Sequence, residues 1–295
     1  MSETGAETAR PTRLGWGDLP QLLALSQALA WDHTQEDWAS FLKCGLIYGL
    51  RRDGAEEPGA PIDACATVFP YGPKAAVLGM VIVAPDRQRR GLGRAVVERC
   101  LKGKPEETAV YLAATPEGLG LYERLGFRRV GGLRKFFHEG GLADGAAPPV
   151  EIRDQIAIAQ LAAVLRLDRA AFGAPRDAFL KARLSQAATR ATAVDAAGDV
   201  VGFGLGVDQG DLRILGPIAA ADDAVAAALV QRLAQGWTGR LRIDAPDHRG
   251  GLCARLEALG FTQVDAPPIL ARDGAAYPGE AAWRDYAAIS CQACL

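Results

Sequence analysis

Short apolar runs alternate with amphipathic segments along the first half of the chain, and this pattern predicts a mixed α/β fold. Apolar positions recur at helical spacing in Asp18–Ala30. A short helix is expected from Thr34 to Lys43, because Thr34 and Asp37 have the spacing of a capping box. Further helices are expected over Arg94–Leu101 and within Thr115–Phe127. The expected strands are Ala9–Arg13, Leu46–Arg51, Ile62–Phe69, Val77–Val83, Ala109–Ala114, Arg128–Val130 and Leu133–His138.

A similar order of elements returns weakly after residue 150, so two related units are expected. Residues Glu139–Pro149 are rich in Gly, Ala and Pro without periodicity, which indicates a linker. The predicted domains are therefore residues 1–140 and 151–295, joined by residues 141–150. Expected helices of the second unit are Ile156–Phe172, Arg176–Ala187, Asp222–Gln235 and Leu252–Leu259, and expected strands are Ala191–Asp195, Val200–Asp208, Leu212–Leu215 and Leu241–Asp244.

Composition limits the partners and the compartment. The net charge of −2 gives no global basic field, so neither nucleic acid nor an anionic membrane is expected as a partner. No apolar run approaches the length of a membrane span, and the polar start is not a secretory signal. The six cysteines lack the spacing of a disulfide framework, which favours free thiols and a cytoplasmic location. Cys291 and Cys294 are interpreted as part of a frayed tail or a last strand, and no metal site is predicted.

The turn Gln88–Gly93, between an apolar strand and a helix, carries the clearest chemical signal. Its glycines allow the backbone to approach an anion closely, and the following helix N-terminus exposes unpaired N–H groups. Formal positive charge comes from Arg87, Arg89, Arg90 and Arg94. The unit therefore predicts a pyrophosphate-binding loop, with a solvated basic turn as the alternative. It has neither Gly-x-Gly-x-x-Gly nor Gly-Lys-Ser/Thr.

The motif Gln/Arg-x-x-Gly-x-Gly after a strand resembles the coenzyme A pyrophosphate loop of the GNAT N-acetyltransferases. A second segment strengthens the resemblance, because the family writes Asn-x-x-Ala-x-x-Leu-Tyr-x-x-x-Gly-Phe after the next strand. Leu121-Tyr122 and Gly126-Phe127 match this pattern. Thr115 replaces the usual Asn and Gly118 the usual Ala. The two ordered motifs cover the first predicted domain.

The second unit resembles the C-terminal half of bacterial tandem GNAT proteins. The segments that carry this resemblance are Gly216-Pro217-Ile218, Arg242–Pro246 and Leu259-Gly260-Phe261. The residues that follow its central strand contain neither Gly-x-Gly nor arginine, and Leu256 stands in the place of Tyr122. Asp222 and Asp223 at the expected helix start would repel a pyrophosphate. This unit is therefore expected to be degenerate, to have lost cofactor binding and to shape the acceptor site.

The resemblance implies an enzyme that moves an acetyl group from acetyl-CoA to a primary amine by direct attack. We expect a small-molecule acceptor, because a second domain over the acceptor cleft leaves little room for a protein tail. A non-catalytic acyl-CoA-binding sensor and a protein lysine acetyltransferase stay open as alternatives, and the chain is expected to be a monomer or homodimer. The implied cofactor-binding residues are Val81, Ile82, Val83, Gln88, Arg89, Arg90, Gly91, Leu92, Gly93, Arg94 and Thr115.

Catalytic and acceptor roles are less determined. By the resemblance, Tyr122 would protonate the departing thiolate, with an ordinary helix aromatic as the alternative. The segment that follows the first helix offers His33 as a catalytic base, with Asp32, Glu36 and Asp37 as other candidates. Aromatic residues suited to a wall for an amine are Trp31, Trp38 and Tyr71, and the acceptor residues expected are Trp31, Asp37 and Tyr71. Core packing is the alternative for these aromatic side chains.

Overall fold

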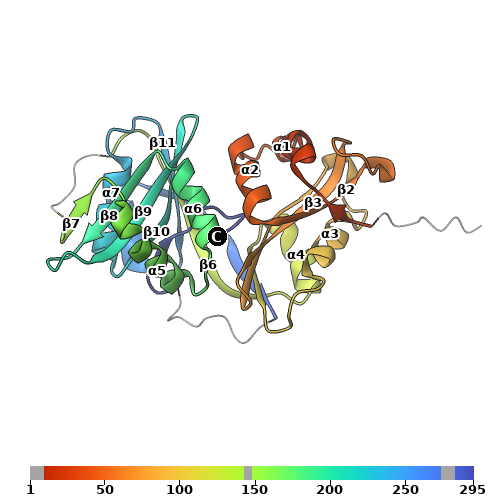
Figure 1. Ribbon diagram of the computed structural model, residues 1–295. Coiled ribbons are helices and arrows are strands. Elements are labelled where there is room, and N and C mark those ends of the chain that lie inside the picture. Colours follow the sequence, from red (N-terminus) through yellow and green to blue (C-terminus); the bar gives the residue numbers. More distant parts are fainter. Residues whose placement is uncertain (1–9, 143–147, 274–282) are drawn as a thin grey trace, which may run out of the picture. The chain divides into compact units, whose positions relative to one another are not determined.

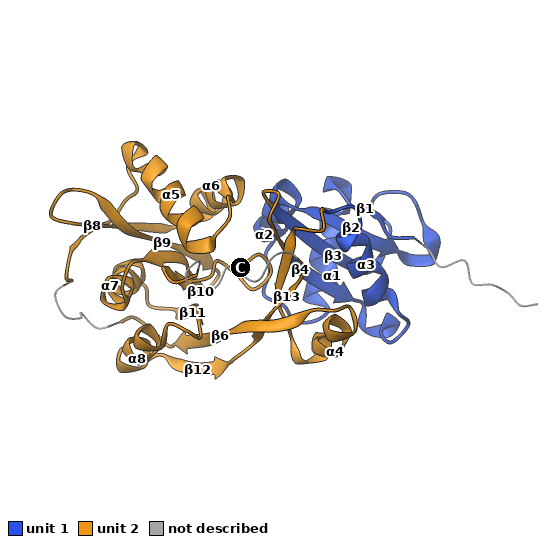
Figure 2. Cartoon of the chain, turned by 90° about the horizontal axis from the view of Figure 1, so that it is seen from below, with its two compact units in different colours: residues 1–70, 78–104 blue, residues 71–77, 105–295 orange. Residues whose placement is uncertain are grey.

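The computed structural model describes residues 10–142, 148–273 and 283–295 (Figure 1). The chain forms two compact units (Figure 2). Unit 1 contains residues 1–70 and 78–104, and unit 2 contains residues 71–77 and 105–295. These units are groups of residues that pack closely together, and their bounds differ from those of the predicted domains 1–140 and 151–295. Residues 143–147 of the predicted linker lie outside the described residues.

The described residues of unit 1 form a sheet with the strand order β1-β2-β3-β4, accompanied by three α-helices. The Thr34–Asp37 capping box is present at the start of α2, as the sequence predicts. The indole N–H of buried Trp38 on α2 donates to the Ser26 hydroxyl on α1 at 3.0 Å, which joins these helices. The elements are β1 Thr12–Arg13, α1 Leu19–Gln27, α2 Gln35–Cys44, β2 Leu46–Arg51, β3 Ile62–Tyr71, β4 Ala75–Val83 and α3 Leu92–Leu101.

Unit 2 contains the strand order β5-β13-β6-β11-β10-β9-β8-β7, with β12 also paired to β6 and β14 to β10. The first residues of β4 lie in this unit, where Ala75–Val77 pair in parallel with Ala109–Tyr111 of β5. The elements are β5 Ala109–Ala113, α4 Pro116–Arg124, β6 Arg128–His138, β7 Glu151–Arg153, α5 Leu161–Phe172, α6 Asp177–Gln186, β8 Thr189–Val194, β9 Val200–Gln209, β10 Leu212–Ala220, α7 Asp223–Ala234, β11 Arg240–Pro246, α8 Gly250–Ala258, β12 Thr262–Asp265, β13 Pro268–Arg272 and β14 Tyr286–Ala288.

The two sequence repeats exchange strands within unit 2. The expectation of two strands at Arg128–Val130 and Leu133–His138 is wrong, because β6 is one continuous strand. Its first half pairs with β13, and β13 also pairs with β5. Its second half pairs with β11 and β12. Because both halves of β6 have strand partners, its backbone stays extended over its full length. The first repeat thus supplies the second half of β6 to β11 and β12, and the second repeat supplies β13 to β5 and β6.

The core of unit 2 extends to the end of the described chain. Helix α7 is rich in Ala, Leu and Val, and it packs its buried face on β8, β9 and β10. Cys294 and Leu295 are fully buried, so the interpretation of a frayed tail is wrong for this segment. All six cysteines lie among the described residues and are thiols.

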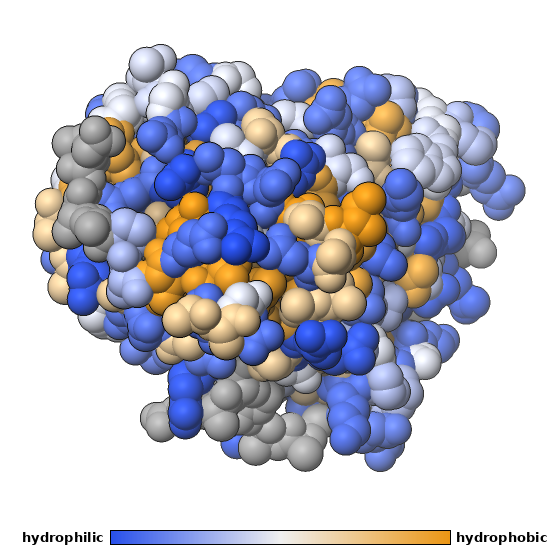
Figure 3. Space-filling model, turned by 60° about the vertical axis from the view of Figure 1, so that its left-hand side comes forward, coloured by the Kyte–Doolittle hydropathy of each residue, from blue (hydrophilic) through white to orange (hydrophobic). Residues whose placement is uncertain are grey.

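Hydrophilic residues cover most of the face drawn in Figure 3, and apolar residues gather in patches between them. Large apolar side chains that are individually exposed include Trp16 and Ile158. No helix in the described parts of the chain combines the length and the apolar character that a membrane span needs. Within the same residues, no group of three or more His, Cys, Asp or Glu side chains is placed to hold a metal ion.

Candidate active site

The loop between β4 and α3 has the backbone geometry of an anion-binding turn. Gly91 is the N-cap of α3 and has a φ of 80°. Arg89 also has a positive φ, 61°, which costs a residue with a side chain about 1–2 kcal/mol. The N–H of Ala95 donates to the Gly91 carbonyl at 3.1 Å. The N–H groups of Leu92–Arg94 therefore have no partner within the helix, and they carry the positive end of its dipole.

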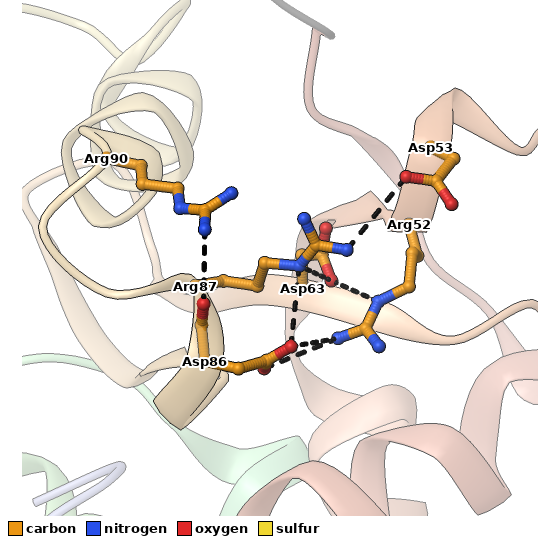
Figure 4. A network of polar contacts seen from close by, with 6 residues as sticks. All are labelled: Arg52, Asp53, Asp63, Asp86, Arg87 and Arg90. Carbon is orange, nitrogen blue, oxygen red and sulfur yellow. Dashed lines mark hydrogen bonds and ion pairs between the residues drawn. The ribbon is translucent and has the colours of Figure 1, made fainter.

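Acidic side chains hold the start of this loop in place (Figure 4). The Arg87 guanidinium lies 3.5 Å from Asp63 and 3.6 Å from Asp86. Arg52 pairs with Asp63 at 2.8 Å and with Asp86 at 3.3 Å. The positive charge of Arg87 is thus compensated within the protein, and the 3₁₀ turn Pro85–Arg87 is fastened to β3.

The sequence patterns considered above do not single out Asp63 as a residue that supports the loop. A signal was present, because an ionisable residue inside the apolar run Ile62–Phe69 needs a partner when that run is buried. The structure buries Asp63 to 8 % exposure and supplies Arg52 and Arg87.

The arginines after the turn remain available to a ligand. Arg89 is exposed and makes no hydrogen bond or ion pair with any described residue. Arg90 is exposed, and its guanidinium donates to the Asp86 carbonyl at 3.5 Å. Arg94 pairs with Glu98 one turn along α3, at 2.7 Å. Arg89 and Arg90 therefore provide the uncompensated charge of the loop.

The strand that leads into the loop is irregular before the residues predicted to contact the cofactor. Met80 lies within β4 and has a φ of 49°. Of the residues that follow, Ile82 is buried, whereas Val81 and Val83 are half-buried. The side-chain amide of Gln88 donates to the Val83 carbonyl at 3.5 Å. Cofactor binding by these residues stays a prediction.

Two further predicted residues, Thr115 and Tyr122, belong to the N-cap and the body of α4, in unit 2. Thr115 is the N-cap of α4, and its hydroxyl accepts the Gly118 N–H at 3.3 Å. The Tyr122 ring is 7 % exposed and packs against Phe127, with the ring centroids 5.8 Å apart. Burial raises the pKa of Tyr122. The phenol therefore stays protonated at neutral pH, and no hydrogen bond joins its hydroxyl to another described residue.

In unit 1, the predicted acceptor residue Trp31 and the predicted base His33 come together. Their ring centroids are 5.7 Å apart, and the ring centroids of His33 and Phe41 are 5.8 Å apart. Asp37 is buried, and its carboxylate accepts both the backbone N–H and the hydroxyl of Thr34 at 2.9 Å. Asp37 therefore has a structural role as a helix cap.

Tyr71 lies in the core of unit 2. It is 2 % exposed, and its hydroxyl donates to the Cys294 carbonyl at 3.0 Å. Its ring meets Phe172 edge-on with the centroids 5.2 Å apart. These contacts give Tyr71 the packing role that was the alternative to an acceptor wall, and substrate contact at this residue stays a prediction.

Comparisons with known proteins agree with these features. Two family models described as acetyltransferase (GNAT) domains match, one over residues 48–129 and the other over residues 164–282. The chain is 33% identical over 253 residues to the uncharacterized N-acetyltransferase YitH of Bacillus subtilis, covering 84% of this chain and 86% of the relative.

Solved structures show the same fold. A putative acetyltransferase from Pyrococcus horikoshii has a TM-score of 0.78 at 18% identity, covering 100% of this chain and 99% of the other. A tandem GNAT protein from the clavulanic acid biosynthesis pathway has a TM-score of 0.65 at 15% identity, covering 91% and 99%. The predicted α/β architecture of two tandem GNAT units is thereby confirmed.

Proposed function

Because the chain belongs to the GNAT acetyltransferase family and is thus an acyltransferase, we propose that it moves an acetyl group from acetyl-CoA to the primary amine of a small molecule. The loop between β4 and α3 carries the proposal. It combines the unpartnered N–H groups of Leu92–Arg94 with the uncompensated charges of Arg89 and Arg90. A pyrophosphate carries the negative charge and the acceptor oxygens that such a site binds.

Bound acetyl-CoA would supply a thioester, and the protein would position it and stabilise charge as it reacts. The backbone of Val81–Val83 would hold the pantetheine arm, with one N–H directed at the thioester oxygen. A fixed donor at that oxygen is worth a few kcal/mol in the transition state.

The Tyr122 hydroxyl would donate a hydrogen bond to the leaving sulfur. Burial raises the pKa of Tyr122 above that of a thiol, so complete proton transfer to the thiolate is uphill. Tyr122 therefore acts mainly by hydrogen bonding to the sulfur as its charge develops.

The attacking amine must lose a proton, and we assign that role to His33. Among the predicted candidates, Asp37 already accepts two hydrogen bonds at the start of α2. A neutral imidazole can accept the proton of an amine, either directly or through water.

A thiol-release assay with acetyl-CoA and a panel of small amines tests the proposal. We expect turnover with at least one amine, and its loss in the Arg89→Glu/Arg90→Glu variant because reversed charge repels the pyrophosphate. The control Arg166→Glu/Arg255→Glu reverses two exposed arginines on α5 and α8 and should keep wild-type turnover. Binding of acetyl-CoA without turnover of any amine would contradict the proposed acetyl transfer and favour a non-catalytic acyl-CoA-binding sensor.

A further inference from the structure

The strand pairing of the two repeats provides a common register for β4 and β10. Each strand has nine residues and begins with three residues in parallel pairing, β4 with β5 and β10 with β11. The first residues, Ala75 and Leu212, are therefore equivalent. In this register, Ile218–Ala220 correspond to Val81–Val83.

Both strands are irregular just before these equivalent positions. Met80 of β4 has a positive φ, and the pairing of β10 with β9 shifts register between Leu215 and Ile218. Direct pairing of β10 with β11 covers Leu212–Ile214 and does not include Ile218–Ala220. Backbone N–H and C=O groups in a buried position need another partner there.

In the second repeat, the chain itself supplies that partner. The strand β14 pairs antiparallel with β10, and Ile218 lies opposite Ala288. The Ala220 N–H donates to the Asp285 carbonyl at 2.9 Å. On the other side, the Ile289 N–H donates to the Asp244 carbonyl of β11 at 3.0 Å. The segment Asp285–Ile289 is thus bonded to both β10 and β11.

The backbone N–H groups at the start of α7, the helix that follows β10, already have a side-chain acceptor and are not available to an anion. The Asp222 carboxylate accepts the N–H groups of Ala224 and Val225, both at 2.8 Å. Ala221 alone joins β10 to this N-cap, whereas Ala84–Arg90 join β4 to Gly91. The second repeat therefore lacks both the loop and the unpartnered amides of the first.

A buried arginine fastens the inserted segment. The Arg176 guanidinium donates to the Tyr286 hydroxyl at 2.9 Å and to the Leu295 carbonyl at 2.6 Å. It also pairs with Asp168 at 2.7 Å, and both side chains are almost fully buried. The hydrogen bonds at Asp285, Tyr286 and Ile289 hold the segment along its length, which indicates that it is a permanent part of the core.

We propose that the segment Asp285–Ile289 lies along Ile218–Ala220 at the place that a cofactor arm would fill. In the first repeat, the corresponding place along Val81–Val83 is filled by the pantetheine arm, and for this comparison the proposal rests on the proposed function. The same kind of strand opening is filled by a ligand in one repeat and by the chain in the other. The second repeat is therefore a permanently filled scaffold, and each chain binds one acyl-CoA.

Hydrogen exchange on the full chain, with and without coenzyme A, tests the inserted segment. We expect exchange at Ala220 and Ile289 to be slower than in an unstructured peptide by on the order of 10³-fold or more, because their opening requires opening of the core. Coenzyme A should slow exchange in Val81–Val83 directly, and should slow exchange at Ala220 and Ile289 by no more than its stabilisation of the whole fold. Exchange of Asp285–Ile289 at unstructured rates would overturn the proposal.

Titration calorimetry with coenzyme A separates the two repeats. Wild type and the Arg166→Glu/Arg255→Glu control should bind one molecule per chain, and Arg89→Glu/Arg90→Glu should bind none. Binding of two molecules per chain by wild type, with one retained in Arg89→Glu/Arg90→Glu, would place a site in the second repeat and refute the proposal. If wild type binds no coenzyme A, the proposed function fails, whereas the exchange rates of Asp285–Ile289 still decide whether the segment is fixed.

Discussion

Gly118 determines how close the ring of Tyr122 lies to the backbone of α4. A Cβ at Gly118 would come within 2.8 Å of the ring carbon Cε2, so the family's usual Ala cannot be accommodated without moving the ring. The departure from the family pattern at Gly118 is thus coupled to the burial of Tyr122. The sequence predicts the tyrosine, but the reason for the glycine is visible only in the packing.

Replacing Tyr122 with Phe tests its assigned role at the scale of one atom. The ring packing is preserved and the hydroxyl is lost, so we expect turnover to fall about 10²-fold or more, within the range for removal of one fixed hydrogen-bond donor to a developing negative charge. Coenzyme A affinity in calorimetry should change little. Wild-type turnover in Tyr122→Phe, under conditions where chemistry limits the rate, would make Tyr122 structural.

The pH dependence gives a second check on the same residue. Burial raises the pKa of Tyr122, so the hydroxyl keeps its proton as pH rises from neutral towards the ordinary phenol value near 10. Turnover limited by chemistry should therefore show no loss from Tyr122 ionisation between about pH 7 and 9.

At the scale of elements, the anion-binding loop depends on residues far from it in sequence. The motif Gln88–Gly93 predicts the turn and the helix start, because glycine placement and helix capping are local effects. The partners of Arg87 come from β3 and from the turn after β2, and single-sequence patterns do not pair such positions. The sequence therefore predicts four arginines that can contact a bound anion. In the structure Arg87 and Arg94 pair with acidic side chains, and Arg89 and Arg90 keep uncompensated charge.

Asp63→Asn tests this support. The substitution removes the charge that Arg52 and Arg87 share, and it leaves a weaker acceptor in a buried position. We expect a loss of about 1–3 kcal/mol in the free energy of unfolding, together with weaker coenzyme A binding as the loop loosens. Thermal denaturation and calorimetry measure the two effects.

Asp53→Asn is the matched control. Its carboxylate is 85% exposed and lies 3.9 Å from Arg87. Exposed pairs of this kind contribute about 0–1 kcal/mol, so stability and affinity should stay close to wild type. Equal effects of both substitutions would contradict a specific supporting role for Asp63.

At the scale of the whole chain, local patterns predict the helices and central strands of both repeats. They do not predict which repeat receives the last strands. The run Ile269-Leu270-Ala271 of β13 is short and follows two prolines, so it carries little signal of its own. Its pairing with β5 and β6 is a long-range contact, and such contacts are set by the packing of the complete chain.

This exchange gives a prediction for the two halves of the chain expressed as separate polypeptides, residues 1–142 and 143–295. The first half lacks β13, so β5 and the first part of β6 lose the partner that lies between them. The second half loses β6, the partner of β11 and β12. Unpaired strand edges and exposed apolar residues such as Ile269 and Leu270 favour aggregation.

We therefore expect each half alone to be aggregated or unfolded, and the two halves to form a 1:1 complex when expressed together. Size-exclusion chromatography with circular dichroism distinguishes these states. The complex should also bind coenzyme A with an affinity close to that of the intact chain, because the loop between β4 and α3 lies wholly within the first half. If the first half is monomeric, cooperatively folded and equally tight in binding, the exchanged strands contribute little to folding, and the two repeats are independent domains despite their shared sheet.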